Sequence, residues 1–139
     1  MCRIAFMAQP SIQLVGILII LTLLMGSCRK VLFYKGRHKI ISRETDTSLA
    51  DSVMIFGKVV SVLDTLSPRP DARVWTTELT LSARADNRGL YSLKLPKGTY
   101  TLNCQGELGT NEFIESTKGI SFLPDEKVEI YFYVGGKVE

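Results

Sequence analysis

Short runs of alternating apolar and polar residues, each closed by a turn signal, fill the chain from residue 53 to residue 134. In residues 99–104, Tyr100, Leu102 and Cys104 fall on one side of an extended chain, because successive side chains of a strand point to opposite faces. About seven such runs, with a turn about every 8–12 residues, predict an all-β fold: a seven-stranded antiparallel sandwich of Greek-key type, or a barrel.

The turn signals have identifiable chemistry. Residues 86–89 (Asp-Asn-Arg-Gly) predict a tight turn, since the Asp86 side chain can bond its own backbone and Gly89 accepts a positive φ. Gly98 follows a proline and predicts the next turn. Gly57 lies inside an apolar run, which is typical of a bulge or of a close backbone approach.

Three aromatic residues are candidates for ligand stacking. Trp75, the only tryptophan, lies in a predicted strand. Tyr131 and Tyr133 alternate with Val128, Ile130, Phe132 and Val134, so they are predicted on the opposite face of the last strand. The two tyrosines either bind a ligand or cover a second apolar surface, and we favour the second interpretation.

The amino terminus has the pattern of a targeting segment. Residues 12–25 (IQLVGILIILTLLM) form an apolar run of fourteen residues. A membrane-spanning helix needs about 20 apolar residues, whereas the core of a signal peptide needs about 7–15. Small residues follow at Gly26 and Ser27, before Cys28. The run therefore predicts a signal peptide.

Residues 24–28 (Leu-Met-Gly-Ser-Cys) resemble a bacterial lipobox. The resemblance implies that the chain is cleaved before Cys28, that a lipid is attached to its thiol, and that residues 1–27 are a lipoprotein signal peptide. Several acyl chains on one cysteine would hold the protein stably on a membrane. The alternatives are an uncleaved signal anchor and ordinary secretion. The absence of an aspartate directly after Cys28 favours the outer membrane of the cell envelope.

Charge is distributed unevenly along the chain. Residues 29–43 contain six basic residues and no acid, whereas residues 44–139 contain ten basic and fourteen acidic residues. We interpret residues 28–50 as a basic tether with little fixed structure, in which 31–34 or 39–42 can add a short strand. The tether either contacts an anionic membrane surface or is a solvated linker. A nucleic-acid partner is not expected, because no folded face of basic residues with interleaved aromatics is evident.

The residues needed for common catalytic sites are scarce. His38 is the only histidine, predicted at the surface, and the spacing of the three cysteines fits neither a metal nor a redox motif. Cys104 is expected to be a buried residue of a strand. Asp125, Glu126 and Glu129 are interpreted as a solvated edge rather than a calcium site. The sequence thus predicts no enzyme, no cofactor and no metal centre.

Residues 85–100 resemble the signature of the carboxypeptidase regulatory-like domain. The matching residues are an aspartate and a glycine in a turn, an aromatic residue after it, and a second glycine and aromatic residue, namely Asp86, Gly89, Tyr91, Gly98 and Tyr100. Residues 55–59 match the family's opening strand through Gly57. The resemblance implies a transthyretin-like sandwich over residues 51–139, with Tyr91 and Tyr100 packed against each other. Ala85 departs from the threonine that is frequent there.

The motif residues serve the fold, so they do not specify chemistry. We therefore predict a non-catalytic module, anchored in the membrane through Cys28, that binds a protein or assists envelope assembly. The alternative is a module that binds carbohydrate or peptide through Trp75, Tyr131 and Tyr133. The sequence does not specify an oligomeric state.

Overall fold

The computed structural model describes residues 32–106 and 114–138, and almost all of its regular structure is β-strand. Residues 32–138 belong to one compact unit. The elements are β1 (Leu32–Tyr34), β2 (Arg37–Thr45), the 3-10 turn η1 (Thr47–Leu49), β3 (Ser52–Ser61), β4 (Arg73–Thr76), β5 (Ser82–Arg84), β6 (Leu90–Pro96), β7 (Gly98–Tyr100), β8 (Leu102–Gln105), β9 (Glu115–Ser116), β10 (Ile120–Phe122), β11 (Glu126–Val134) and β12 (Gly136–Val138). Among these residues, no helix has the length and apolar character that a bilayer crossing requires.

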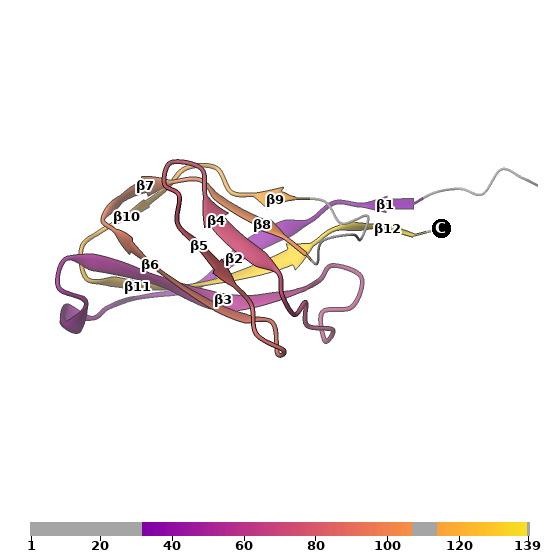
Figure 1. The fold of residues 1–139 in the computed structure, drawn as a ribbon, viewed down its shortest axis with the longest axis horizontal. Coiled ribbons are helices and arrows are strands. Elements are labelled where there is room, and N and C mark those ends of the chain that lie inside the picture. Colours follow the sequence, from indigo (N-terminus) through magenta and orange to yellow (C-terminus); the bar gives the residue numbers. More distant parts are fainter. Residues whose placement is uncertain (1–31, 107–113, 139) are drawn as a thin grey trace, which may run out of the picture. The chain divides into compact units, whose positions relative to one another are not determined.

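Two four-stranded sheets face each other across the core (Figure 1). Sheet I has the order β2-β11-β3-β6, and sheet II has the order β5-β4-β8-β9. Two short pairs extend these sheets: β1 with β12 beyond the β2–β11 ladder, and β7 with β10 beyond β8 and β9. The predicted all-β sandwich is confirmed, although the strands are more numerous than the seven expected.

One strand pair departs from the antiparallel expectation. β11 pairs with β3 in parallel and with β2 antiparallel. The reason lies in the connection: between β3 and β11 the chain passes through all of sheet II, and it returns to sheet I in the direction of β3. Such a long connection is what a parallel pair requires.

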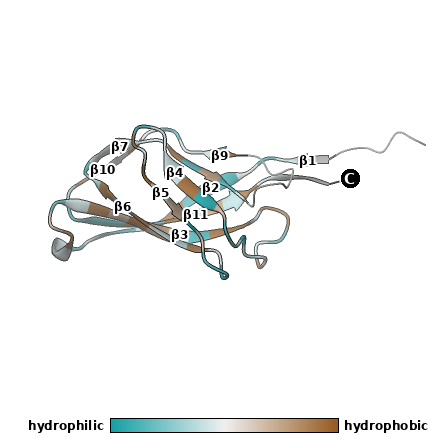
Figure 2. Cartoon of the chain, in the orientation of Figure 1, coloured by the Kyte–Doolittle hydropathy of each residue, from teal (hydrophilic) through white to brown (hydrophobic). Residues whose placement is uncertain are grey.

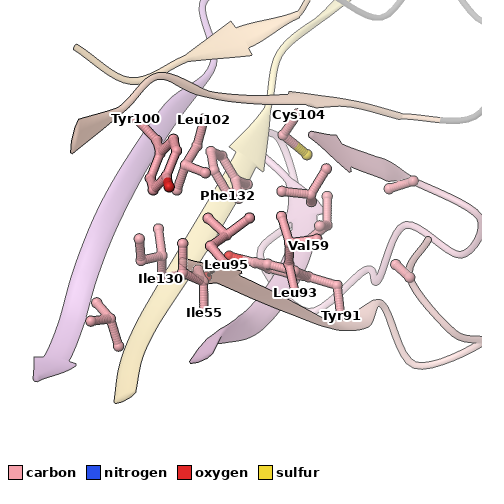
Figure 3. Close-up of a cluster of buried hydrophobic side chains, with 14 of the residues drawn as sticks. Ile55, Val59, Tyr91, Leu93, Leu95, Tyr100, Leu102, Cys104, Ile130 and Phe132 are labelled. Atoms are coloured by element: carbon pink, nitrogen blue, oxygen red, sulfur yellow. Dashed lines mark hydrogen bonds between the residues drawn. The ribbon is translucent and has the colours of Figure 1, made fainter. Parts of the chain in front are cut away.

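The core lies between the two sheets and follows the predicted alternation. Val128, Ile130, Phe132 and Val134 are buried, whereas Tyr131 and Tyr133 are only partly buried on the other face of β11. Figure 2 shows hydrophobic and hydrophilic residues mixed along the strands. Residues of both sheets form a single buried cluster that includes Ile55, Val59, Tyr91, Leu93, Leu95, Tyr100, Leu102, Cys104, Ile130 and Phe132 (Figure 3). The predicted burial of Cys104 is confirmed.

The segment predicted as a basic tether is ordered over much of its length. Arg37–Thr45 is a nine-residue strand that pairs with β11, and Leu32–Tyr34 pairs with β12. The prediction of little fixed structure is therefore wrong for these residues, whereas the alternative of a short strand at 31–34 or at 39–42 agrees with β1 and β2. Cys28 and the predicted signal peptide lie outside the described residues.

The full length of β2 was not predicted, because it is an edge strand with weak alternation. Most of its residues are exposed, and the ladder with β11 shifts register between Glu129 and Ile130. At this bulge Ser42 faces Glu129 and Ile40 faces Ile130, so Ile41 is an extra residue. An extra residue interrupts the period of two that a sequence pattern can reveal.

Gly57 allows two backbones to approach closely at the centre of sheet I. A Cβ atom on Gly57 would lie 1.9 Å from the carbonyl oxygen of Ile130, and the residue has a φ of 156°. Tyr91 lies directly opposite Gly57 on β6, and its hydroxyl donates to the same Ile130 oxygen at 2.8 Å. Both motif residues thus contact the Ile130 carbonyl group: Gly57 lets it approach closely, and Tyr91 donates a hydrogen bond to it.

The turn at residues 86–89 has the predicted chemistry. The Asp86 carboxylate accepts from the amides of Arg88 at 2.8 Å and Leu90 at 2.9 Å. The Leu90 amide contributes most to holding the pKa of Asp86 below its ordinary value. Gly89 has a φ of 74°, and a Cβ atom there would lie 2.5 Å from the Val59 carbonyl oxygen. Only glycine fits this position without strain.

Tyr91 and Tyr100 do not form the predicted pair. Tyr91 packs on Phe132 with a centroid distance of 5.9 Å, and Tyr100 packs on Phe122 at 6.4 Å. The Tyr100 hydroxyl donates to the Pro96 carbonyl at 3.0 Å. The reason is that β6 belongs to sheet I while β7 pairs with β10, so the two tyrosines lie at opposite ends of the cluster in Figure 3.

Candidate functional site

The structure distributes the three candidate stacking residues over two sheets. Trp75 lies on β4 of sheet II between the buried Val74 and Thr76, so its ring points away from the core. Tyr131 and Tyr133 lie on the outer face of sheet I. The two sheets pack together through their inner faces, so Trp75 does not join the tyrosines in one binding site.

An open pocket of about 390 Å³ surrounds Trp75 on sheet II. The lining residues are Arg73, Trp75, Thr76, Thr77, Leu79, Thr80 and Leu81. The guanidinium carbon of Arg73 lies 5.5 Å from the Trp75 ring centroid, which is a cation–π arrangement. Leu81 is 41% exposed at the rim. We call this site the Trp75 pocket.

Hydrogen bonds fix the loop that forms the rim of the Trp75 pocket. The Thr76 hydroxyl donates to the Leu79 carbonyl at 2.9 Å and accepts from the Leu79 amide at 3.2 Å. Both carboxylate oxygens of Glu78 lie 2.9 Å from the Thr101 amide, which is the main reason why the pKa of Glu78 is lowered. The Thr77 amide donates to the Thr101 carbonyl at 3.0 Å. The rim is thus held against the start of β8.

The outer face of sheet I carries basic and aromatic side chains from all four strands. The register places Lys39 beside Tyr131, and Arg37 beside Tyr133. It also places Lys127 between Glu44 and Met54. We call this surface the basic face; its charged and aromatic members are Arg37, Lys39, Glu44, Phe56, Lys58, Lys94, Lys127, Glu129, Tyr131 and Tyr133.

Cations and rings contact each other on the basic face. The guanidinium carbon of Arg37 lies 4.7 Å from the Tyr133 ring centroid, and the Lys127 ammonium lies 5.2 Å from that of Phe56. An open pocket of about 330 Å³ is lined by Arg37, His38, Lys39 and Tyr133. Partial desolvation, and then Glu129, raise the pKa of Tyr131.

The basic face contradicts the prediction that no folded surface combines basic residues with aromatics. That prediction treated residues 29–43 as a tether and the remainder as mildly acidic. Instead, β2 brings Arg37 and Lys39 into the sheet, where they meet lysines from three other strands. The basic face cannot be recognised from the sequence alone, because its residues come from strands that are far apart in sequence.

His38 is better connected than its sequence context suggested. Its Nδ1 lies 3.0 Å from the Glu115 carboxylate, which joins β2 of sheet I to β9 of sheet II. The same side of the sandwich has a second link, since Arg43 pairs with Glu126 at 2.8 Å and donates to the Ser121 carbonyl at 3.2 Å. His38 is thus a partly exposed residue whose ion pair links the two sheets.

The acidic residues considered for calcium have other contacts. The Asp125 carboxylate accepts from the Asp51 amide at 2.8 Å, and Glu126 pairs with Arg43. Glu129 faces outward on sheet I. Over residues 32–106 and 114–138, no three histidine, cysteine or acidic side chains are grouped so that they could hold a metal ion.

Comparisons with known proteins do not assign this chain to a family. No family model matches the sequence, and no curated protein matches it. Among solved structures, the chain is similar to a chain of a type II cohesin–X-dockerin complex from Acetivibrio cellulolyticus, an N-terminal interface mutant, with 17% identity and a TM-score of 0.43. The similarity covers 60% of this chain and 57% of that one, so it spans less than two thirds of either.

Proposed function

We propose that this protein is a lipid-anchored interaction module of the bacterial cell envelope that binds a protein partner through the Trp75 pocket. The observation that carries the proposal is the pocket itself. It combines an outward tryptophan and an arginine over its ring, both on β4, with two leucines of the loop that follows β4. Tryptophan and arginine are enriched among the residues that dominate the energy of protein interfaces.

The rim of the pocket supports this function because it is already ordered. The bonds of Thr76 to Leu79, and of Glu78 to Thr101, hold the loop in one conformation. A partner that binds an ordered loop does not have to compensate for the entropy of ordering it. The exposed Leu81 supplies apolar area beside the ring.

The anchor in this proposal depends on the amino-terminal sequence. The apolar run at 12–25, followed by Gly26, Ser27 and Cys28, supports lipidation of Cys28 at the outer membrane. The finer fold assignment, a transthyretin-like domain of the carboxypeptidase regulatory type, is likewise a proposal. It is supported by the way Gly57 and Tyr91 meet at one carbonyl group.

A carbohydrate or peptide is the second candidate ligand of the same pocket. Threonine hydroxyls stand beside the indole ring, and Thr77 and Thr80 are among the lining residues. Hydroxyl groups next to an aromatic ring suit a ligand that has both polar groups and apolar faces. The Arg73 side chain over the ring favours the protein partner, because it occupies stacking area that a sugar would use.

The proposal is tested by placing a photo-crosslinking amino acid in the full chain in living cells. At Thr80, inside the pocket, we expect one discrete protein adduct that disappears in Trp75→Ala. At Ser92, on the outer face of sheet I, the same amino acid serves as the matched control. Equal adducts from both positions, or an adduct that persists in Trp75→Ala, would contradict the proposal. Glycan-array binding that is lost in Trp75→Ala would replace it with the carbohydrate candidate.

A further inference from the structure

The charged groups on the outer face of sheet I are mainly cationic. The basic face holds five cationic side chains, three of which are exposed, and only two carboxylates. Most other acids lie in turns or in pairs: Asp46 binds Ser48, Asp86 binds its own turn, and Glu115 binds His38. Sheet I therefore presents a cationic surface on a domain whose folded sequence is not basic overall.

The geometry of this surface suits an extended anionic partner. Its cations stand in separate rows: Lys94 and Lys127 in one row, Lys58 and Lys39 in another, and Arg37 beyond them. A row that holds Phe56 and Glu129 lies between the first two. Neighbouring strands are about 4.8 Å apart, so these side chains cover an area rather than a point. An area of separate cations matches a surface that carries many separate anions.

We propose that the basic face docks on the anionic headgroup surface of a lipid bilayer. Lysine and arginine near such a surface each contribute about a fivefold gain in binding. The tyrosines strengthen the argument, because Tyr131 and Tyr133 combine an apolar ring with a polar end, the character that places tyrosine at membrane interfaces. The pocket between Arg37, Lys39 and Tyr133 offers room for one phosphate-bearing headgroup.

Chain connectivity favours a bilayer over other polyanions, and this step rests on the proposed anchor. Only three residues separate Cys28 from Leu32, where β1 begins, so the link reaches about 14 Å at most. β1 leads directly into β2, whose first residue is Arg37 of the basic face. A lipid on Cys28 would thus keep this face within reach of the headgroups.

The two proposed surfaces are compatible with each other. The basic face and the Trp75 pocket lie on the outer sides of different sheets, with the core between them. A domain that rests on the bilayer through sheet I leaves sheet II exposed to a partner. Membrane docking would therefore orient the Trp75 pocket rather than compete with it.

The test compares lysine reactivity in the full chain, purified from bacterial membranes and reconstituted in two kinds of vesicle. One is phosphatidylcholine alone, and the other is an equimolar mixture with phosphatidylglycerol. Amine labelling read by mass spectrometry should show Lys39, Lys58 and Lys94 protected only in the anionic vesicles. Lys97 and Lys118, exposed outside the basic face, should stay equally reactive in both. High salt should restore the reactivity of the protected lysines, because it shortens the screening length to about 3 Å at 1 M.

A pair of charge-matched variants tests whether the face acts as a unit. Lys39→Ala combined with Lys94→Ala removes two exposed cations from the basic face. Arg84→Ala combined with Lys118→Ala removes two exposed cations elsewhere. We expect the protection factor of Lys58 to fall by roughly 25-fold in the first variant and to stay unchanged in the second.

The possible outcomes separate this inference from the proposed function. Recovery of the chain with the vesicles, and the mass of the peptide that contains Cys28, report on the anchor alone. If the anchored chain shows the same lysine reactivity in both kinds of vesicle, the docking proposal fails while the anchor stands. Protection of the same lysines by a short RNA, but not by anionic vesicles, would also overturn it and identify a nucleic-acid surface.

Discussion

Sheet I and sheet II share one core, but they are held together in different ways. Sheet I consists of strands of seven to ten residues. Its central strand β11 pairs with β2 on one side and with β3 on the other, along almost its full length. The strands of sheet II have two to four residues. The long ladders of sheet I bond most of its backbone groups, whereas sheet II adds hydrogen bonds from side chains to its short ladders.

Those side-chain bonds cluster around β8. The Thr117 hydroxyl accepts from the Leu102 amide at 2.9 Å, and Asn103 bonds with both Thr77 and Ser116.

The difference in strand length between the two sheets explains the character of their outer faces. A long, regular ladder displays side chains over a wide area, which gives the basic face. Short strands with fixed loops form a local hollow, which gives the Trp75 pocket.

The largest loss of stability is expected from a substitution at the centre of sheet I. Gly57→Ala should lower the free energy of unfolding by about 3 kcal/mol or more, since its Cβ would meet the Ile130 carbonyl oxygen at 1.9 Å. Urea denaturation measured by circular dichroism provides the value. Gly136→Ala is the matched control, because a Cβ there has no neighbour within 4 Å. Similar losses in both variants would show that the centre of sheet I carries no special constraint.

The features that the sequence predicted are local ones. The turn at residues 86–89 depends on Asp86 and Gly89, which lie within four residues of each other and needed no distant partner to be recognised. The burial of Phe132 and its neighbours followed from a period of two within a single strand. The strand of Tyr91 and the importance of Gly57 were also predicted. Their meeting at Ile130 was not, because that residue comes from a third strand.

The features that the sequence did not predict depend on contacts between distant segments. His38 and Glu115 are 77 positions apart, so their ion pair leaves no local pattern. β2 is an exposed edge strand with a bulge, and its alternation is too weak to recognise. The basic face combines residues of four strands, and its discovery requires the order of those strands. Trp75 was predicted as a candidate for ligand stacking, but the sheet that carries it was not assigned.

A smaller effect is expected from a side-chain bond of sheet II. Thr117→Val keeps the shape of the buried side chain but leaves the Leu102 amide without its hydroxyl partner. An unsatisfied buried donor costs about 1–3 kcal/mol, so urea denaturation should show a loss in that range. Thr99→Val removes an exposed hydroxyl bond to Ser121 and should cost less than about 0.5 kcal/mol. Equal losses would mean that sheet II does not rely on Thr117.

The smallest expected effect concerns the acid sensitivity of the Trp75 pocket. Because the Thr101 amide lowers the pKa of Glu78 in the folded protein, the ionised carboxylate stabilises the loop above the ordinary pKa of glutamate, about 4.3. As the pH falls from there through the lowered pKa, that contribution is lost. Trp75 emission should therefore change in this acidic range in the wild-type protein, and much less in Glu78→Gln.

Asp86→Asn provides the comparison, since the pKa of Asp86 is also lowered but by amides of the turn before β6. This variant should reduce the acid dependence of overall stability while leaving the pH profile of Trp75 emission as in the wild type. If Glu78→Gln instead keeps the wild-type emission profile, then the bond between Glu78 and Thr101 does not hold the rim. Side-chain hydrogen bonds would then not stabilise sheet II at the Trp75 pocket, which is the part of that sheet proposed to bind the partner.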